Sequence, residues 1–267
     1  MSSDLHYAQT KFSLTNFQLK IIALVTMIID HAGMIFQGYN DWDLSWMRLI
    51  GRISFPIFAF LISEGCRHTK NMKKYMLRLL IFAVIIHLAF ALKDVLAYFL
   101  STDLGSFGFL PNLNIFFTLF FGVTSVFFYE KIDGISNLPD SSLQKYILRL
   151  LPFVLIVIAA ELLGADYGGL GVFMIFIIYT ARSKAMRLQN MFIAVLFLYF
   201  SCLSPSNFRA LLAGEDLTFL MPFFAMISLL FVSFYNGEKG RSWKWFFYFA
   251  YPAHFIILLG LYFSLTL

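Results

Sequence analysis

Nine apolar runs follow one another along the chain, separated by short polar segments. A bilayer core about 30 Å thick is crossed by about 20 apolar residues in helical form, and most of the runs approach that length. Backbone groups in lipid must form hydrogen bonds within their own segment, so runs of this kind predict helices. We therefore expect an all-α, polytopic integral membrane helical bundle with about nine transmembrane helices, at approximately 17–36, 46–65, 77–100, 113–129, 146–163, 168–181, 190–204, 217–235 and 244–265.

The composition agrees with a membrane protein. Of the 267 residues, 60% are apolar and 13% are charged, whereas soluble domains are nearer to half apolar and a quarter charged. No repeat, low-complexity tract or interdomain linker interrupts the chain, so residues 1–267 are expected to form a single membrane-embedded domain. The two cysteines, Cys66 and Cys202, lack the spacing of a zinc or haem site, and no metal site is expected.

Basic residues predict the orientation in the membrane. With a cytoplasmic N-terminus, sixteen of the 20 Lys and Arg residues fall on the cytoplasmic side, as the positive-inside rule requires. This bias explains most of the net charge of +5, so no nucleic-acid partner is implied, and a multi-pass protein of the inner (cytoplasmic) membrane is expected. The short runs at 168–181 and 190–204 could form a re-entrant pair instead. Two short spans are preferred because they leave the basic residues between them on the cytoplasmic side.

The first run carries the most informative polar groups. Lys20 and His31 are eleven residues apart, so in a helix both project from one face, about 16 Å apart along the axis. Ionisable groups deep in an apolar span are costly to bury, which favours a functional role. Asp30 points about 100° away from His31 and is expected to anchor another helix. An ion pair between Asp30 and Arg52 of the second run is the structural alternative to a catalytic role for both.

Two further histidines lie at a similar depth in their runs. His254 follows Pro252, which removes one backbone hydrogen bond and allows a local opening of the helix. A catalytic role and a core hydrogen bond are equal alternatives for His254. His87 has no other polar residue nearby, so a packing role is favoured for it.

The loop after the second run is the most basic part of the chain. Lys74 and Arg78 are four residues apart and share a helix face. They are either ordinary positive-inside flanking residues or, together with Lys20, a set that binds the phosphates of a nucleotide cofactor. Glu64 lies one turn from His68, where it would orient the imidazole or line the entrance for the cofactor.

Taken together, these segments resemble the TraX family of conjugal-pilin acetylases, within the wider membrane acyltransferase group that includes acyltransferase family 3. The similarity extends over nearly the whole chain, through LKIIALVTMIIDHAGMIF, GRISFPIFAFLISEGCRHTKNMKKYMLRLL, NLNIFFTL, ADYGGLGVF and YFAYPAHFIIL. The wider group shares a basic residue eleven positions before a histidine, which Lys20 and His31 match. The run GRISFP with EGCRHT is the more specific TraX-like mark. Where the wider group often has Arg-x-x-Arg at the third helix, this chain has Lys74-x-x-x-Arg78.

The resemblance implies transfer of an acetyl group from cytosolic acetyl-CoA, with His31 as the essential base. Lys20, Lys74 and Arg78 would then hold the CoA phosphates, and Arg52 would either stabilise the developing oxyanion or hold Asp30. The acceptor that the resemblance implies is the N-terminal amine of a membrane-inserted pilin. A hydroxyl of a cell-surface glycan would require the same base and the same phosphate contacts.

A proton-coupled transporter or channel is the alternative function. Asp30, His31 and His254 would then relay protons within the bilayer. The Lys20 stripe and the basic second loop favour the enzyme, because a proton relay needs no phosphate-binding residues.

Overall fold

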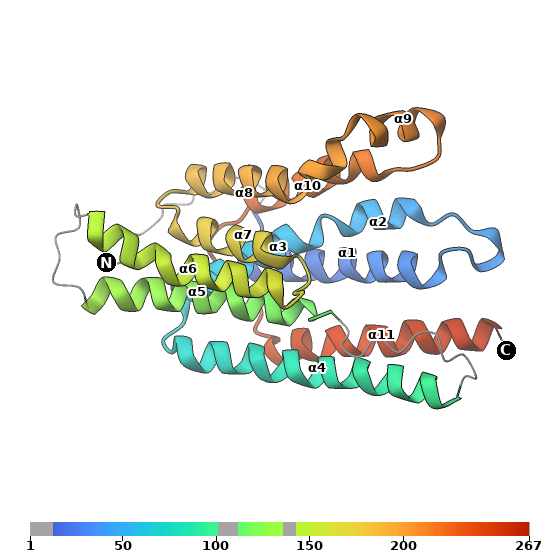
Figure 1. Cartoon of the computed structure of the whole chain (residues 1–267), viewed down its shortest axis with the longest axis horizontal. Coiled ribbons are helices and arrows are strands. Elements are labelled where there is room, and N and C mark those ends of the chain that lie inside the picture. The colour runs from blue at the N-terminus through green and yellow to red at the C-terminus, as the bar shows by residue number, and fades with distance from the viewer. Residues whose placement is uncertain (1–12, 101–111, 136–142, 267) are drawn as a thin grey trace. The chain divides into compact units, whose positions relative to one another are not determined.

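The computed structural model describes residues 13–100, 112–135 and 143–266, without the side chains of residues 90, 92–100, 133–135, 244 and 266. Across these residues every long element is an α-helix, three short 3-10 helices lie between them, and no β-strand occurs (Figure 1). The predicted all-α membrane bundle is confirmed. Lys11, one of the sixteen basic residues that the sequence predicts on the cytoplasmic side, lies outside the described residues.

Contacts divide the chain into two compact units. Unit 1 comprises residues 1–61 and 180–267, and unit 2 comprises residues 62–179. The helix α3 (Ser54–His68) begins in unit 1 and ends in unit 2. The other elements of unit 1 are α1 (Asn16–Phe36), η1 (Tyr39–Asp41), α2 (Ser45–Gly51), α8 (Lys184–Leu198), η2 (Phe200–Leu203), α9 (Pro205–Ala213), η3 (Thr218–Leu220), α10 (Met221–Ser233) and α11 (Lys244–Thr266). Those of unit 2 are α4 (Met72–Leu100), α5 (Ile115–Ile135), α6 (Leu143–Leu162) and α7 (Gly168–Thr180). The single domain expected over residues 1–267 stays a prediction.

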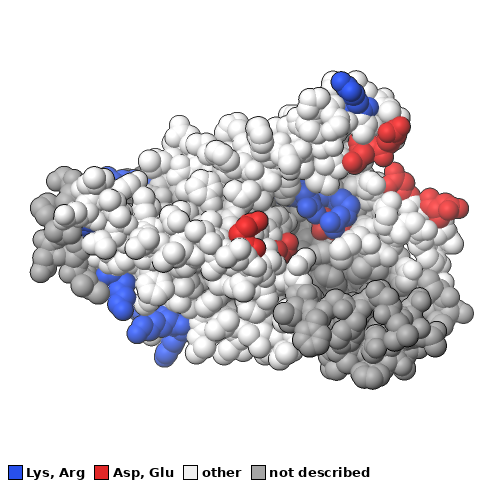
Figure 2. Space-filling view, in the orientation of Figure 1, with Lys and Arg blue, Asp and Glu red and all other residues white. Residues whose placement is uncertain are grey.

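Each of the nine predicted apolar runs overlaps a helix of the structure. Among the described residues, five helical segments are long and apolar enough to cross a membrane, and a sixth is obtained if α9 and η3–α10, bent by 118°, form one broken span. Large apolar side chains such as Leu155 on α6 and Ile256 on α11 are exposed, as lipid-facing residues are. Most of the face shown in Figure 2 carries no charged side chain. The chain is a membrane protein, and the nine passes and the cytoplasmic N-terminus stay predictions.

The second run is interrupted where the sequence predicted one continuous helix. It consists of α2 and α3, which are separated at Arg52 and Ile53. Pro56 explains the break, because it has no N–H to donate to the carbonyl of residue 52, four positions earlier, and its ring would collide with that carbonyl. The amides of Arg52 and Ile53 instead bond to the carbonyls three residues before them, at 3.1 and 3.2 Å.

The region between the seventh and eighth runs also differs from expectation. The helix α8 begins at Lys184 and ends at Leu198, earlier than the predicted 190–204, and the unpredicted helix α9 follows η2. Ser204 caps α9 by accepting a hydrogen bond from the amide of Asn207 at 3.3 Å, and Pro205 occupies its first turn. Serine followed by proline is a common helix start, so this signal was present in the sequence.

In unit 1, α1 packs against α2 and α11 (Figure 1). Its start is fixed by a capping box, in which Thr15 and Gln18 exchange side chain–backbone hydrogen bonds. The segment before α1 pairs with the chain after α10, since the amide of Leu14 donates to the carbonyl of Phe234 and its carbonyl accepts from Asn236. The ionisable groups of α1 are therefore carried on a helix that is held at its N-terminal end and along two sides.

In unit 2, α5 packs against α4 and α6. The side-chain amide of Asn114 donates to the carbonyl of Ala83 at 2.9 Å and so joins the start of α5 to α4. Gly169 at the start of α7 meets the backbone of Val157 so closely that a β-carbon would not fit. The carboxylate of Glu161 accepts from the amide of Gly169 at 2.8 Å and caps α7. Glu161 is thereby engaged within the protein.

Candidate functional site

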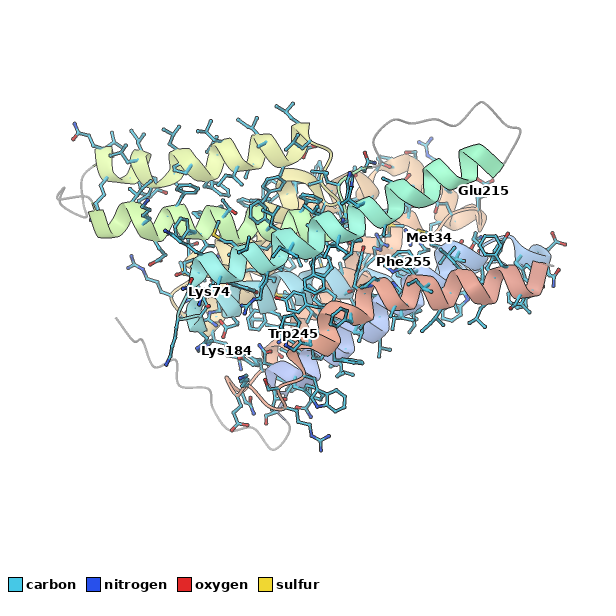
Figure 3. All side chains as sticks on the ribbon, turned by 90° about the horizontal axis from the view of Figure 1, so that it is seen from below. Met34, Lys74, Lys184, Glu215, Trp245 and Phe255 are labelled. Carbon is cyan, nitrogen blue, oxygen red and sulfur yellow. The ribbon has the colours of Figure 1, made fainter. Side chains whose placement is uncertain are left out.

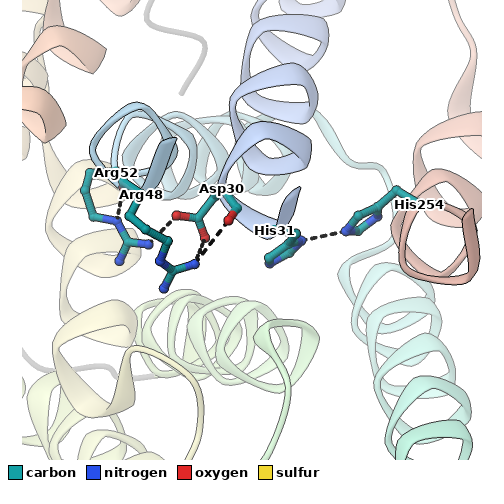
Figure 4. A network of polar contacts seen from close by, with 5 residues as sticks. All are labelled: Asp30, His31, Arg48, Arg52 and His254. Atoms are coloured by element: carbon teal, nitrogen blue, oxygen red, sulfur yellow. Dashed lines mark hydrogen bonds and ion pairs between the residues drawn. The ribbon is translucent and has the colours of Figure 1, made fainter. Parts of the chain in front are cut away.

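The carboxylate of Asp30 forms ion pairs with two arginines, Arg48 of α2 and Arg52 of the segment that follows α2. One carboxylate oxygen accepts from Arg48 at 2.7 Å and the other accepts from Arg52 at 2.6 Å (Figure 4). Asp30 is buried. The predicted anchoring of a second helix by Asp30, including the Asp30–Arg52 ion pair, is present in the structure. Sequence reasoning missed Arg48, although its spacing of four residues from Arg52 places both on one helix face.

Two glycines let α1 and α2 approach closely around this ion-pair cluster of Asp30, Arg48 and Arg52. A β-carbon on Gly51 would overlap the side chain of Asp30, and one on Gly33 would lie 2.6 Å from the β-carbon of Met47. Real β-carbons do not approach so closely, so a larger residue at either position forces the helices apart. The position of Asp30 therefore depends on glycine at residue 51.

His31 projects toward α11, away from the ion-pair cluster (Figure 4). Its Nδ1 lies 2.6 Å from Nε2 of His254, and the two rings are stacked with their centroids 4.8 Å apart. Phe255, labelled on α11 in Figure 3, packs against both imidazoles with its ring centre 4.4 Å from that of His31 and 4.5 Å from that of His254. His254 is buried and His31 is partly exposed.

The hydrogen bonds of this histidine pair define which ring nitrogens donate and which accept. Nδ1 of His254 lies 3.0 Å from the carbonyl oxygen of Ala250, which can only accept, so this Nδ1 carries the hydrogen. In a neutral His254 the Nε2 is then an acceptor, and Nδ1 of His31 donates to it. A neutral His31 consequently presents Nε2 as a lone pair, and no side chain or backbone group among the described residues is bonded to that nitrogen. Of the two roles considered for His254, the core hydrogen bond is present, and so is a direct contact with His31.

Lys20 lies on the same side of α1 as His31. Its ammonium nitrogen is 5.5 Å from the ring centre of Phe247 on α11, about two turns before His254. Both side chains contact α11. The shared face of Lys20 and His31 that the sequence predicts is therefore the face of α1 that packs on α11. His87, by comparison, meets the edge of Phe117 in unit 2, at 5.8 Å between ring centres, which agrees with a packing role.

The remaining candidates lie in unit 2. Glu64 is buried and forms ion pairs with Arg67 at 3.7 Å and with the exposed imidazole of His68 at 3.6 Å. Arg67 also donates to the carbonyl of Tyr179. The Glu64–His68 contact thus exists as predicted, and Arg67 is a second partner that sequence reasoning did not assign.

Lys74 and Arg78 are both in the first two turns of α4. Lys74 is exposed (Figure 3), and the guanidinium of Arg78 lies over the ring of Tyr75, 5.7 Å from its centre. Lys20 belongs to unit 1 and these two residues belong to unit 2. Their joint binding of phosphates therefore stays a prediction from the sequence.

A family model described as TraX protein matches residues 16–262. The chain belongs to the TraX family. It is also 28% identical, over 249 residues, to a protein of Dichelobacter nodosus described as "Probable fimbrial assembly protein FimC, serogroup H1". That similarity covers 91% of this chain and 93% of the relative. No solved structure matches the chain significantly.

The TraX match includes all of α1 and most of α11. The ion-pair cluster and the His31–His254 pair consequently lie within the part of the chain that the family shares. Membership of the wider acyltransferase group stays a prediction from the resemblance of the motifs.

Proposed function

We propose that this TraX-family protein is an integral-membrane acetyltransferase. In this proposal an acetyl group passes from cytosolic acetyl-CoA to an acceptor amine, and His31 is the general base. The observation that supports it most strongly is the arrangement of the histidine pair, in which His254 and the Ala250 carbonyl leave Nε2 of His31 as a lone pair. A partly exposed imidazole with one free nitrogen has the form that a general base requires.

The chemical step needs a single proton acceptor. The acceptor nitrogen attacks the thioester carbonyl and forms a C–N bond, while Nε2 of His31 takes one proton from that nitrogen. The C–S bond then breaks, and His31 returns the proton to the departing thiolate, which gives the acetylated amine and free CoA. An N-terminal amine has a pKa near 8 in ordinary peptides, and a positioned base typically contributes about 10²- to 10⁴-fold to the rate.

Asp30 and Arg52 act as positioning residues in this proposal. Their ion pair joins α1 to the second run, and Asp30 is the neighbour of His31 in sequence. This arrangement fixes the direction of His31 toward α11. His254 is likewise a positioning residue, since it acts on the substrate only through His31.

The donor side of the proposal rests on basic residues. We propose from the sequence that Lys20, Lys74 and Arg78 bind the phosphates of acetyl-CoA at the cytoplasmic edge, and that the exposed His68, held by the buried Glu64, lies at the entrance. Guanidinium and ammonium groups suit phosphate oxygens, and Lys20 shares a face of α1 with His31.

The acceptor we favour is the N-terminal amine of a membrane-inserted pilin. Two comparisons support a pilin-related role, namely the TraX family itself and the relative whose name describes fimbrial assembly. A cell-surface glycan hydroxyl is the other acceptor that the same base would serve.

The test uses the whole purified protein in liposomes with acetyl-CoA labelled in the acetyl group. Acceptors are a membrane-inserted peptide with a pilin-like N-terminus, the same peptide with its amine blocked, and a lipid-linked oligosaccharide. We expect label on the free amine and none on the blocked peptide. Label on the oligosaccharide alone would contradict the pilin acceptor, and absence of transfer to all three would contradict the enzyme.

A proton-coupled transporter is the second candidate, because two imidazoles in contact could pass a proton between α1 and α11. Asp30 is less suited to such a relay, since both of its oxygens are bound by arginines. The same liposomes, loaded with a pH-sensitive dye and given no acceptor, separate the two functions. Proton movement without acetyl transfer would favour the transporter.

A further inference from the structure

Arg48 has hydrogen-bond donors that the protein does not use. One terminal nitrogen donates to the Asp30 carboxylate at 2.7 Å and to the Asp30 backbone carbonyl at 3.3 Å. Within the part of the chain that the structure describes, its Nε and its second terminal nitrogen have no partner. A guanidinium carries five N–H groups, so Arg48 retains three that can bind another acceptor.

The ion-pair cluster is not neutral. It contains one carboxylate and two guanidinium groups, and these lie on helical segments apolar enough to cross a membrane. Two arginines on one aspartate leave a formal excess of one positive charge. An uncompensated charge at such a place is unfavourable unless it meets an anion.

The two arginines differ in what they can reach. The side chain of Arg52 is 14% exposed, and its Nε donates to the backbone carbonyl of Arg48 at 3.0 Å. The side chain of Arg48 is 33% exposed, so the excess charge is accessible at Arg48. Arg48 also donates to the backbone carbonyl of Asp30, the residue that directly precedes His31 in α1 (Figure 4).

We propose that Arg48 is the anion-binding residue of the site and donates to a negatively charged oxygen of the substrate beside His31. This inference rests on the proposed acetyl transfer. The oxygen is either the one that becomes an oxyanion when the amine attacks the thioester carbonyl, or a permanent carboxylate or phosphate on the acceptor. Both present a negatively charged oxygen that the remaining N–H groups of Arg48 can bind, and a carboxylate or phosphate can accept two of them at once.

The experiment compares Arg48→Lys with the wild-type protein in steady-state acetyl transfer. Lysine preserves the charge and can still pair with Asp30, but it loses the fork of donors. We expect transfer to fall by about 10²- to 10³-fold, which is the loss that removal of one donor to an oxyanion typically causes. A lower kcat at unchanged KM assigns the transient oxyanion, whereas a higher KM for the acceptor assigns a permanent anion on it.

Two further variants make the outcome specific. The variant Arg48→Met removes every donor of Arg48 while Asp30 keeps its ion pair with Arg52, and it should be at least as impaired as Arg48→Lys even if the lysine variant folds poorly. Arg209→Gln removes an exposed arginine of α9 and should transfer at the wild-type rate. Normal kcat and KM in either Arg48 variant, with an active wild-type protein, would overturn the role of Arg48 alone. Absence of transfer by the wild-type protein would overturn the proposed function and this inference with it.

Discussion

Asp30 and His31 are neighbours in sequence, but the two sides of α1 that they occupy are organised in opposite ways. On the Asp30 side, both carboxylate oxygens are bound and the residue is buried. On the His31 side, one ring nitrogen is bound by His254 and the other has no partner among the described residues. The comparison indicates that the costly carboxylate stabilises the arrangement of helices, whereas the costly imidazole remains available for chemistry.

The geometry of a helix explains this division. Successive residues point about 100° apart, so one turn of α1 can face α2 with Asp30 and α11 with His31. The two roles can therefore be separated by substitutions, and the first three predictions below test one side of α1 against the other, with His87 as a comparison in unit 2.

Asp30→Ala should have the largest effect on stability. Removing the carboxylate leaves two guanidinium groups without their anion, which typically destabilises a protein by about 3–5 kcal/mol. Thermal unfolding in detergent measures this loss, and we expect a strongly lowered yield of folded protein. An Asp30→Ala protein that unfolds at the wild-type temperature would contradict the structural assignment of Asp30.

Gly51→Ala should destabilise the same side of α1 without removing any polar group. The added methyl overlaps Asp30 and forces α2 away, at about 1–3 kcal/mol for overpacking of this kind. Gly260→Ala is the matched control, because a β-carbon there meets nothing within 4 Å. Equal unfolding temperatures for the two variants would show that the close approach of α1 and α2 is not required.

His254→Leu should reduce activity on the other side of α1. Loss of the acceptor for Nδ1 of His31 leaves the tautomer of the base unspecified, and removal of such a supporting group typically lowers activity by about 10- to 100-fold. His254→Gln should recover most of the kcat, since its amide oxygen can accept the same hydrogen bond. If the Leu and Gln variants transfer acetyl equally well, His254 does not position the base.

His87→Gln should have the smallest effect. His87 is partly exposed and meets only the edge of Phe117 in the described contacts, and substitutions away from a buried polar network are usually within about 0.5 kcal/mol. Unfolding temperature and acetyl transfer should both stay at wild-type values. A His87 variant that folds but loses transfer would place a required imidazole in unit 2.

Much of the fold follows from local sequence signals. Hydrophobic runs predict the positions of the helices because the pattern depends only on residues within one segment. The break at Arg52 was missed because Pro56 lies inside a run that reads as one span, and α9 was missed because a short helix contains too few apolar residues to stand out.

Less of the candidate site could be predicted. The eleven-residue spacing predicts that Lys20 and His31 share a face of α1. The angle of about 100° between successive residues predicts that Asp30 contacts a different helix from His31. The contact between His31 and His254 joins residues 223 positions apart, and nothing in either local sequence specifies that α1 packs on α11. Arg48 is a different case, because a single basic residue near the end of an apolar run is typical of a flanking position, and its spacing of four residues from Arg52 does not specify the partner that the two share.

The central claim is that His31 performs chemistry while its neighbour Asp30 maintains the structure. The most direct measurement is acetyl transfer by His31→Gln, made on protein whose unfolding temperature has been determined beside that of the wild type. The account predicts an unfolding temperature close to that of the wild type and a transfer rate lower by about 10²- to 10⁴-fold. A folded His31→Gln protein that transfers acetyl at the normal rate would contradict it.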